Sequence, residues 1–404
     1  MKASPSLLSC AGLSALMLSA GVLAAAGASG QCGVTVFDSG SKGEDGTFAP
    51  TSDQVIDTST TGVWKYSTID IPAGVKVTFK KNPANTGVIW LAQGDVNIAG
   101  EIDLDGADGT TNIARGNEAP GGPGGFAGGR GGRRVDVSGS GDGTPGEGPG
   151  GGDPGVTGGS ATGGQYGTSG SGGLSPPLLG GSGGGGSGSG PGWDGVNGGG
   201  GGGAILIASS TTISVKGSMH SNGGSGTYAR CGDLGCGPLS GSGSGGAIRL
   251  VANCIEWSGS ITAIGGGGIA GGAGRIKTEA FDFLHFTGHT NPVATQGRPV
   301  SINLTNLGTI SITSIAGQVV SIPPSGDTAS PDVIFSQGGP ITVVLKTTNI
   351  PAGTSLTVCA ATDGPAICAT PSSRTDASGN ASATLTVPAG YGTIQAWAEY
   401  TVTP

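Results

Sequence analysis

The sequence has few of the side chains that build an enzyme core or a charged surface. Of its 404 residues, 4% are aromatic, 11% are charged, and three are His. Leu, Glu and Lys are sparse, which argues against a helical protein. The formal net charge of -8 gives no electrostatic basis for binding nucleic acid or an anionic membrane. We therefore expect an all-β extracellular protein with no nucleic-acid partner.

Long hydrophobic runs are also missing once the first thirty residues are set aside. Those thirty contain Lys2, an apolar run from Leu7 to Ala26, and small residues at the end. This order is typical of a cleavable secretory signal, which we assign to residues 1–28, with an uncleaved membrane anchor as the alternative. The sequence thus predicts a secreted or cell-surface protein with no transmembrane anchor after cleavage.

Six cysteines remain when Cys10 is removed with the signal, and an even number in an exported chain indicates disulfides. Turn-forming residues between close cysteines favour two pairs, and a third is left over: Cys359 with Cys368, Cys231 with Cys236, and Cys32 with Cys254. Sequence does not settle the pairing. A metal site is the alternative, but the paired C-x-x-C motifs of zinc sites are absent, so we predict no metal.

Glycine is abundant instead, with 88 residues, yet it lacks the strict period of collagen. A repeated unit accounts for much of the rest. Each copy begins with Gly, alternates apolar residues over two short runs, and reaches another Gly 13 or 14 residues later. The copies are residues 87–104, 203–222 and 246–264, with a weaker fourth at 274–288.

Alternation predicts strands with one buried face. Three short strands separated by Gly corners would form one coil of a parallel β-solenoid, and stacked coils would bury a continuous core. We assign the solenoid to residues 31–290, with an entry coil at 63–79 and a β-sandwich with Gly-rich loops as the alternative. Two ladders should stack inside it, namely Ile89/Ile205/Ile248 and Leu91/Ile207/Leu250. The irregular spacing of the copies predicts insertions at one corner of the coil.

The longest insertion covers residues 116–203, where 42 of 88 residues are Gly. Its default interpretation is a flexible loop, because little apolar surface is available to offset ordering. The alternative is a packed layer of extended Gly-rich strands, since Gly allows close approach of backbones. Because loop closure costs little, we expect deletion of residues 126–196 to leave the fold stable.

The C-terminal part has a different composition. After a linker at residues 291–308, short Val/Ile/Thr strands and Pro/Gly turns alternate through residues 309–404. This spacing predicts a small Ig-like β-sandwich with Leu345 and Trp397 in its core.

The repeat G-x-I-x-L-x-A…I-x-x-G-x-I-x-A-x-G-G spans roughly residues 62 to 288. It resembles the right-handed β-helices of the filamentous-haemagglutinin and pectin-lyase-like type. The tail resembles bacterial Ig-like modules. The resemblance implies secretion and a surface or matrix role. Pectin-lyase-like enzymes carry clustered Asp with Arg or Lys on one face of the solenoid, and no such cluster is evident in this sequence.

Two clusters are candidate binding residues. Asp103, Asp105 and Asp108 lie in DLDGADG, where carboxylates two residues apart on a strand share a face and suit Ca²⁺ or an acid/base pair. The EF-type calcium pattern fails here, and Asp also favours turns without a ligand. The basic cluster GGRGGRR could contact acidic polysaccharide or form a solvated loop; its members are Arg130, Arg133 and Arg134.

These patterns predict a secreted or cell-surface structural or adhesive protein without catalytic activity or cofactor. Its expected partners are extracellular polysaccharide or cell-surface components. The alternative is a polysaccharide-binding or polysaccharide-degrading protein. Placement separates the two, because glycoside chemistry needs a charged partner near Asp103 and Asp105.

Overall fold

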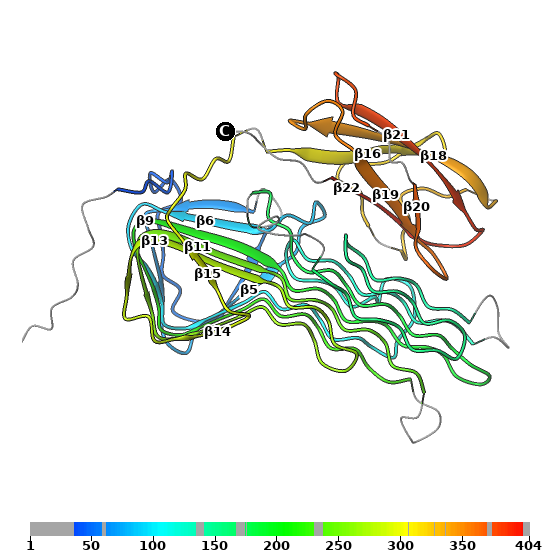
Figure 1. Cartoon of the computed structure of the whole chain (residues 1–404), viewed down its shortest axis with the longest axis horizontal. Coiled ribbons are helices and arrows are strands. Elements are labelled where there is room, and N and C mark those ends of the chain that lie inside the picture. The colour runs from blue at the N-terminus through cyan, green and yellow to red at the C-terminus, as the bar shows by residue number, and fades with distance from the viewer. Residues whose placement is uncertain are drawn as a thin grey trace, which may run out of the picture. The chain divides into compact units, whose positions relative to one another are not determined.

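The computed structural model describes residues 36–58, 62–134, 141–166, 174, 176–229, 237–305, 307–326, 328–335, 337–369 and 374–398. The expected signal at residues 1–28 lies outside this part, as do Cys32, Cys231 and Cys236. Every regular element in the described residues is a strand, so the all-β class is confirmed (Figure 1). No helix in them is long and apolar enough to cross a membrane.

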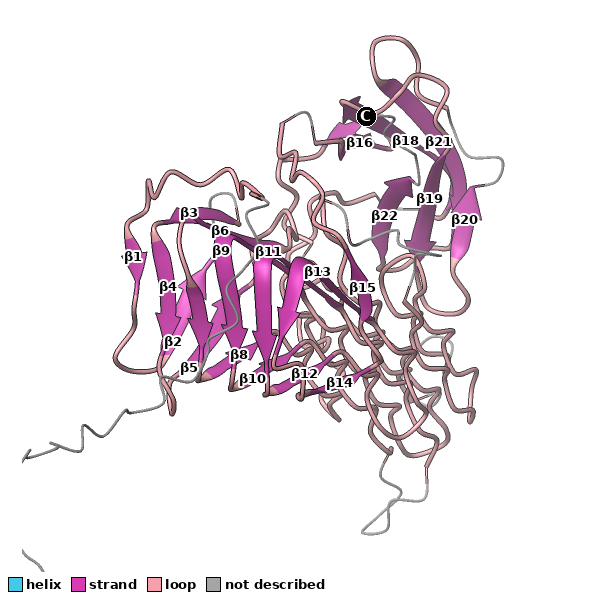
Figure 2. Cartoon of the chain, turned by 60° about the vertical axis from the view of Figure 1, so that its left-hand side comes forward, coloured by secondary structure: helices cyan, strands magenta, loops and turns pink. Residues whose placement is uncertain are grey.

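Two parallel sheets contain the repeated unit (Figure 2). The long sheet consists of β1 (Thr47–Phe48), β3 (Val63–Tyr66), β4 (Thr68–Ile71), β6 (Val88–Ala92), β7 (Val96–Ile98), β9 (Ala204–Val215), β11 (Ala247–Trp257), β13 (Arg275–Leu284) and β15 (Thr295–Gly297). The short sheet consists of β2 (Gln54–Asp57), β5 (Lys76–Lys80), β8 (Glu101–Asp103), β10 (Ser218–His220), β12 (Ser260–Thr262) and β14 (His289–Asn291). Successive copies contribute neighbouring strands to both sheets, as the repeat predicts.

The apolar core includes the inward columns of both sheets. Ile205 pairs with Ile248 and Ile207 pairs with Leu250, as predicted, and all four side chains are fully buried. The short sheet adds a column with the same alternation, in which Ile102 and Ile261 flank Met219. Burial of one continuous column across several copies explains why a single repeat could not be stable alone.

The first copy departs from the predicted ladder. Val88 and Trp90 pair with Ile205 and Ile207, so Ile89 and Leu91 point to the opposite face of the long sheet. That face is covered as well, by Phe37, Leu174 and Leu178. All five residues of β6 are consequently buried. A continuous apolar run is typical of a parallel strand buried on both faces, and alternation alone misassigned it.

The scarce aromatic residues gather near the two ends of the stack. Near the first strands, Trp90 packs against three rings at centroid distances of 5.3 to 5.9 Å, those of Phe48, Tyr66 and Phe79. Near the last strands, Phe286 packs against Trp257 at 4.5 Å and against Phe283 at 5.3 Å. Large rings therefore fill the ends of the apolar interior, where no further coil supplies aliphatic contacts.

The Gly-rich segments form an ordered body, which we call the glycine slab. It consists of residues 105–115, 119–134, 141–148, 150–158, 159–166, 179–190, 193–203, 221–229, 237–246, 264–268 and 269–274. Each excursion leaves after β8, β10 or β12 and returns at β9, β11 or β13. Insertion at one corner of the coil is thus confirmed, and the extended segments continue outward from the sheets (Figure 1).

Residues 179–190 run through the middle of the slab. Their backbone groups bond to six neighbouring segments, which are 119–134, 141–148, 150–158, 159–166, 193–203 and 237–246. Donors that serve one neighbour recur every three residues: Gly181, Gly184 and Ser187 donate to Gly202, Gly199 and Val196. A period of three without internal hydrogen bonds is that of a polyproline II helix. Six neighbours around one such helix correspond to hexagonal packing.

A second segment, 237–246, is enclosed in the same way. Its six neighbours are 159–166, 179–190, 193–203, 221–229, 264–268 and 269–274. Both central stretches, 180–190 and 240–246, are composed of Gly and Ser and are buried throughout. A Cβ on Gly184 would collide with the carbonyl oxygen of Gly241, which explains the composition.

The insertion is therefore an ordered, buried layer and not a flexible loop. The same packing also extends beyond residues 116–203. Backbone hydrogen bonds between segments replace the apolar burial that the sequence lacks. This arrangement opposes the expectation that residues 126–196 can be deleted without loss of stability.

The C-terminal part contains two antiparallel sheets with a shared core. One consists of β16 (Thr309–Ile315), β17 (Gln318–Val319), β18 (Gly339–Thr348) and β21 (Asn380–Val387), and the other of β19 (Leu356–Ala361), β20 (Ile367–Ala369) and β22 (Thr393–Ala398). Leu345 is buried in this core as predicted. The prediction for Trp397 is wrong, because alternation along β22 turns Ile394 and Ala396 inward instead.

Of the predicted disulfides, Cys359–Cys368 is confirmed, and it joins paired residues of β19 and β20. Cys254 is also disulfide-bonded. Its expected partner Cys32 lies outside the described residues, as does the pair Cys231–Cys236.

Candidate functional site

The outward face of the short sheet collects most of the polar chemistry of the repeats. Because side chains alternate along each strand, one residue in two points away from the core. Register aligns them in two columns, Lys76/Glu101/Ser218/Ser260/His289 and Thr78/Asp103/His220/Thr262/Asn291. We call these ten residues the outer polar face.

Lys76 connects the two acidic residues of this face. Its Nζ lies 2.9 Å from Oε1 of Glu101 and 2.6 Å from Oδ2 of Asp103. The hydrogen bonds that Lys76 donates to these two carboxylates, the one to Asp103 first, raise the pKa of Lys76 above its usual value, so the ammonium form is retained. Both carboxylates are thereby occupied by a cation of the same chain.

The face extends to the neighbouring copies. Nδ1 of His220 lies 2.9 Å from Oγ1 of Thr262. Oδ1 of Asp105 accepts a 2.6 Å hydrogen bond from the backbone N–H of Asn222, and the N–H of Asp105 donates to Asp103. Desolvation of the Asp105 carboxylate raises its pKa, against the lowering effect of the Asn222 hydrogen bonds. The structure therefore gives Asp103 a charged partner, Lys76, whereas the carboxylate of Asp105 bonds to the neutral Asn222.

Asp108 belongs to a different arrangement. Its Oδ1 accepts a 2.7 Å hydrogen bond from the backbone N–H of Ser225 in the next copy. The step of three residues from Asp105 matches the period of the slab, and it recurs in the donors of the next copy, because Asp105 accepts from Asn222 and Asp108 accepts from Ser225. Within the described residues, no group of three His, Cys, Asp or Glu is placed to hold a metal ion.

The basic cluster lies in the glycine slab, away from the outer polar face. The side chain of Arg130 is 6% exposed and forms an ion pair with Asp363 of the C-terminal part. Arg115, which sequence reasoning missed, places its guanidinium carbon 3.4 Å from the ring centroid of Tyr391. Burial, and then the charges of Arg130 and Arg133, lower the pKa of Arg115. Arg134 anchors a turn through its backbone N–H to Asp194.

A small pocket opens beside these arginines. Its charged and aromatic lining residues are Arg115, Glu118, Arg130, Glu147 and Tyr391. Acidic and basic groups alternate around it, and several are used internally: Glu118 accepts a 2.9 Å hydrogen bond from Thr328. Of the three predicted arginines, Arg130 therefore contacts the C-terminal part, whereas Arg134 contacts another segment of the slab.

Lys76, Glu101 and His220 were missed because sequence reasoning treated each short motif by itself. Aligning the last short strand of three copies, EID, SMH and SIT, places Asp103 in one column with His220 and Thr262, and Glu101 in the other column with Ser218 and Ser260. No family model, curated protein or solved structure matches this chain.

Proposed function

We propose that this chain is a secreted or cell-surface structural or adhesive protein. The two parallel sheets are inferred to close into a β-solenoid, since each copy contributes one strand to each sheet and turns at a Gly corner. The C-terminal part is inferred to be an Ig-like sandwich, on the basis of seven short antiparallel strands in two sheets with one core.

The glycine slab is the observation that carries the proposal. Two of its segments bond through the backbone to six neighbours each, and their central stretches, 180–190 and 240–246, bear no side chain larger than Ser. A layer of this kind has few rotatable side chains, and hydrogen bonds to neighbours on all sides hold each central segment in place. It provides stiffness and reach at a fixed position relative to the sheets, which is the requirement for a scaffold.

The geometry of the acidic residues favours binding or structure over catalysis. A glycosidase needs one carboxylic acid and one carboxylate flanking the scissile bond. Here Lys76 donates to both Glu101 and Asp103, so neither is poised to transfer a proton.

Gene deletion in the source organism tests the scaffold role. We expect weaker attachment to surfaces or to other cells, restored by the unaltered gene and by Gly267→Ala. Gly184→Val should not restore it, because this substitution places a side chain inside the slab. If deletion leaves attachment, aggregation and envelope texture unchanged, the proposal is wrong.

Polysaccharide binding at the outer polar face is a second candidate function. The juxtaposition of Lys76, Asp103 and His220 on a flat exterior favours it, since these groups can hydrogen-bond sugar hydroxyls. Purified protein should retain selected polysaccharides from a panel, with loss in His220→Ala. Lys346→Ala in the C-terminal part is the control, and equal retention by both variants would oppose the idea.

A further inference from the structure

Both ends of the short sheet have an unpaired strand edge. Within the described residues, β2 is hydrogen-bonded to β5 alone, and β14 is bonded to β12 alone. Asp53, Gln54 and Val55 are exposed at the first edge, and His289 and Asn291 at the last. Free N–H and C=O groups along an exposed edge are a template for another strand.

The two edges are compatible in direction. Every pair in the short sheet is parallel, so β2 of a second copy can lie beside β14 and continue the sheet without reversal. Such a contact joins different surfaces of the two copies. Repetition of the same contact then produces an open chain of molecules rather than a closed dimer.

Register determines which residues would meet. Gln54 opposes Val77, which places Asp53 beside Lys76, and the backbone N–H of Lys76 donates to Asp53 at 2.9 Å. Extending the columns past β14 brings His289 beside Asp53 of the next copy and Thr290 beside Gln54. The first contact joins a basic group to a carboxylate, and the second joins two hydrogen-bonding side chains.

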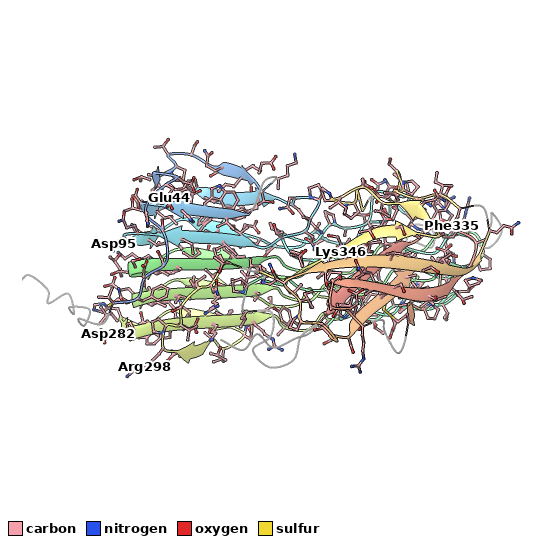
Figure 3. The ribbon with its side chains drawn as sticks, turned by 90° about the horizontal axis from the view of Figure 1, so that it is seen from above. Glu44, Asp95, Asp282, Arg298, Phe335 and Lys346 are labelled. Atoms are coloured by element: carbon pink, nitrogen blue, oxygen red, sulfur yellow. A yellow bond between two sulfur atoms is a disulfide. The ribbon has the colours of Figure 1, made fainter. Side chains whose placement is uncertain are left out.

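Charge at the two ends is complementary over a wider area. Residues 36–57 contain five carboxylates and one Lys, a net charge of -4, whereas residues 285–298 contain one Arg, two His and no carboxylate, a net +1 with His neutral. Figure 3 shows Glu44 beside the first strands and Arg298 beside the last, at opposite ends of the stack. Opposite charges steer two such ends together.

We propose that copies of this chain associate head to tail, with β2 of one copy beside β14 of the next. The partner is a second copy of the same chain, and the product is a linear assembly that continues the short parallel sheet. This inference rests on strand edges and charge, and its failure would leave the scaffold role of a single copy intact.

Sedimentation of the purified mature protein over a range of concentrations tests the proposal. We expect concentration-dependent association that weakens with salt, and linear particles by electron microscopy. His289→Asp places like charges together and should raise the dissociation constant about fivefold or more. Asp53→Lys should do the same independently, and the double variant should recover association.

Ser218→Asp is the matched control, since it adds a carboxylate to the same column on an interior strand. It should leave association unchanged, and thermal unfolding of each variant checks that the fold is retained. A monomer at every concentration, a closed dimer, or equal effects of Ser218→Asp and His289→Asp would each overturn the proposal.

Discussion

At the scale of single residues, the space around the backbone determines which glycines of the slab tolerate a side chain. A Cβ at Gly184 collides with backbone of residue 241, whereas a Cβ at Gly267 meets only Ser225 Oγ, at 3.8 Å. We expect Gly184→Val to destabilise the fold by about 3 kcal/mol or more, as overpacking against rigid backbone does. Gly267→Ala should be neutral or stabilising by about 0.5 kcal/mol. Urea unfolding of both variants measures the contrast, and equal stabilities would contradict close packing at residue 184.

A buried ion pair on the outer side of the long sheet is a second residue-scale test. Nε of Arg249 donates to Glu279 Oε2 at 2.6 Å, and the two side chains are 4% and 1% exposed. Lys277 lies 2.8 Å from the other carboxylate oxygen. Glu279→Ala leaves buried positive charge and should cost about 3–5 kcal/mol. Arg249→Met with Glu279→Leu should recover most of that loss in urea unfolding, and additive losses would contradict the pairing.

The pKa of Asp105 gives a pH-dependent prediction. Because desolvation raises this pKa in the folded state, the neutral carboxyl is favoured by folding, and that stabilisation is lost as the pH rises through the folded pKa. Asp105→Asn stays neutral at every pH. Its stability relative to the unaltered protein should therefore increase between about pH 3 and pH 6. Unfolding measured across this range checks the sign, and a relative stability that decreases with pH would show that the pKa is lowered instead.

At the scale of elements, the disulfide between β19 and β20 closes a short hairpin. The two cysteines are nine residues apart, and their residues are direct partners in the sheet. Replacing both with Ala should lower stability by about 2–3 kcal/mol through the entropy of the unfolded chain. Thermal unfolding of the C-terminal part, followed with and without reductant, measures this loss. The double variant should be insensitive to reductant in that transition.

Element order was largely predictable, and the reason lies in the repeat. Alternating residues in copies 203–222 and 246–264 gave the correct inward columns, because Ile205 and Ile248 pair directly. The first copy failed at Ile89 because the strand is buried on both faces, which alternation does not describe. The residues that cover the second face, such as Phe37 and Leu178, are distant from β6 in sequence, so no local sequence pattern predicts that they pack there.

The site was predicted in part. Asp103 does meet a charged group, Lys76, but this lysine comes from an earlier strand of the short sheet and is found only through the register of the stack. The role of Asp108 was hidden because its partner, Ser225, lies 117 residues away. A step of three between polar residues, as in 105/108 and 222/225, is the sequence signal of a slab built on the polyproline II period.

At the scale of the whole molecule, the sheets and the slab are stabilised by different interactions. The sheets bury aliphatic columns in the usual way. The slab has almost no side chains to bury and depends on hydrogen bonds between segments. These two bodies share every segment that passes from slab to strand, such as residues 193–203 into β9. Deleting residues 126–196 removes the central stretch 180–190 itself and the segment 159–166, which both bond to residues 237–246, so stability should fall rather than stay constant.

Amide hydrogen exchange of residues 180–190 and 240–246 tests the central claim most directly. Their N–H groups are buried and bonded to neighbouring segments, so exchange requires the slab to open. We predict that peptides from both stretches are protected as strongly as peptides from β9 and β11. Exchange at the rate of an unfolded chain in the two stretches, with β9 and β11 still protected, would contradict the packed slab and restore the flexible loop.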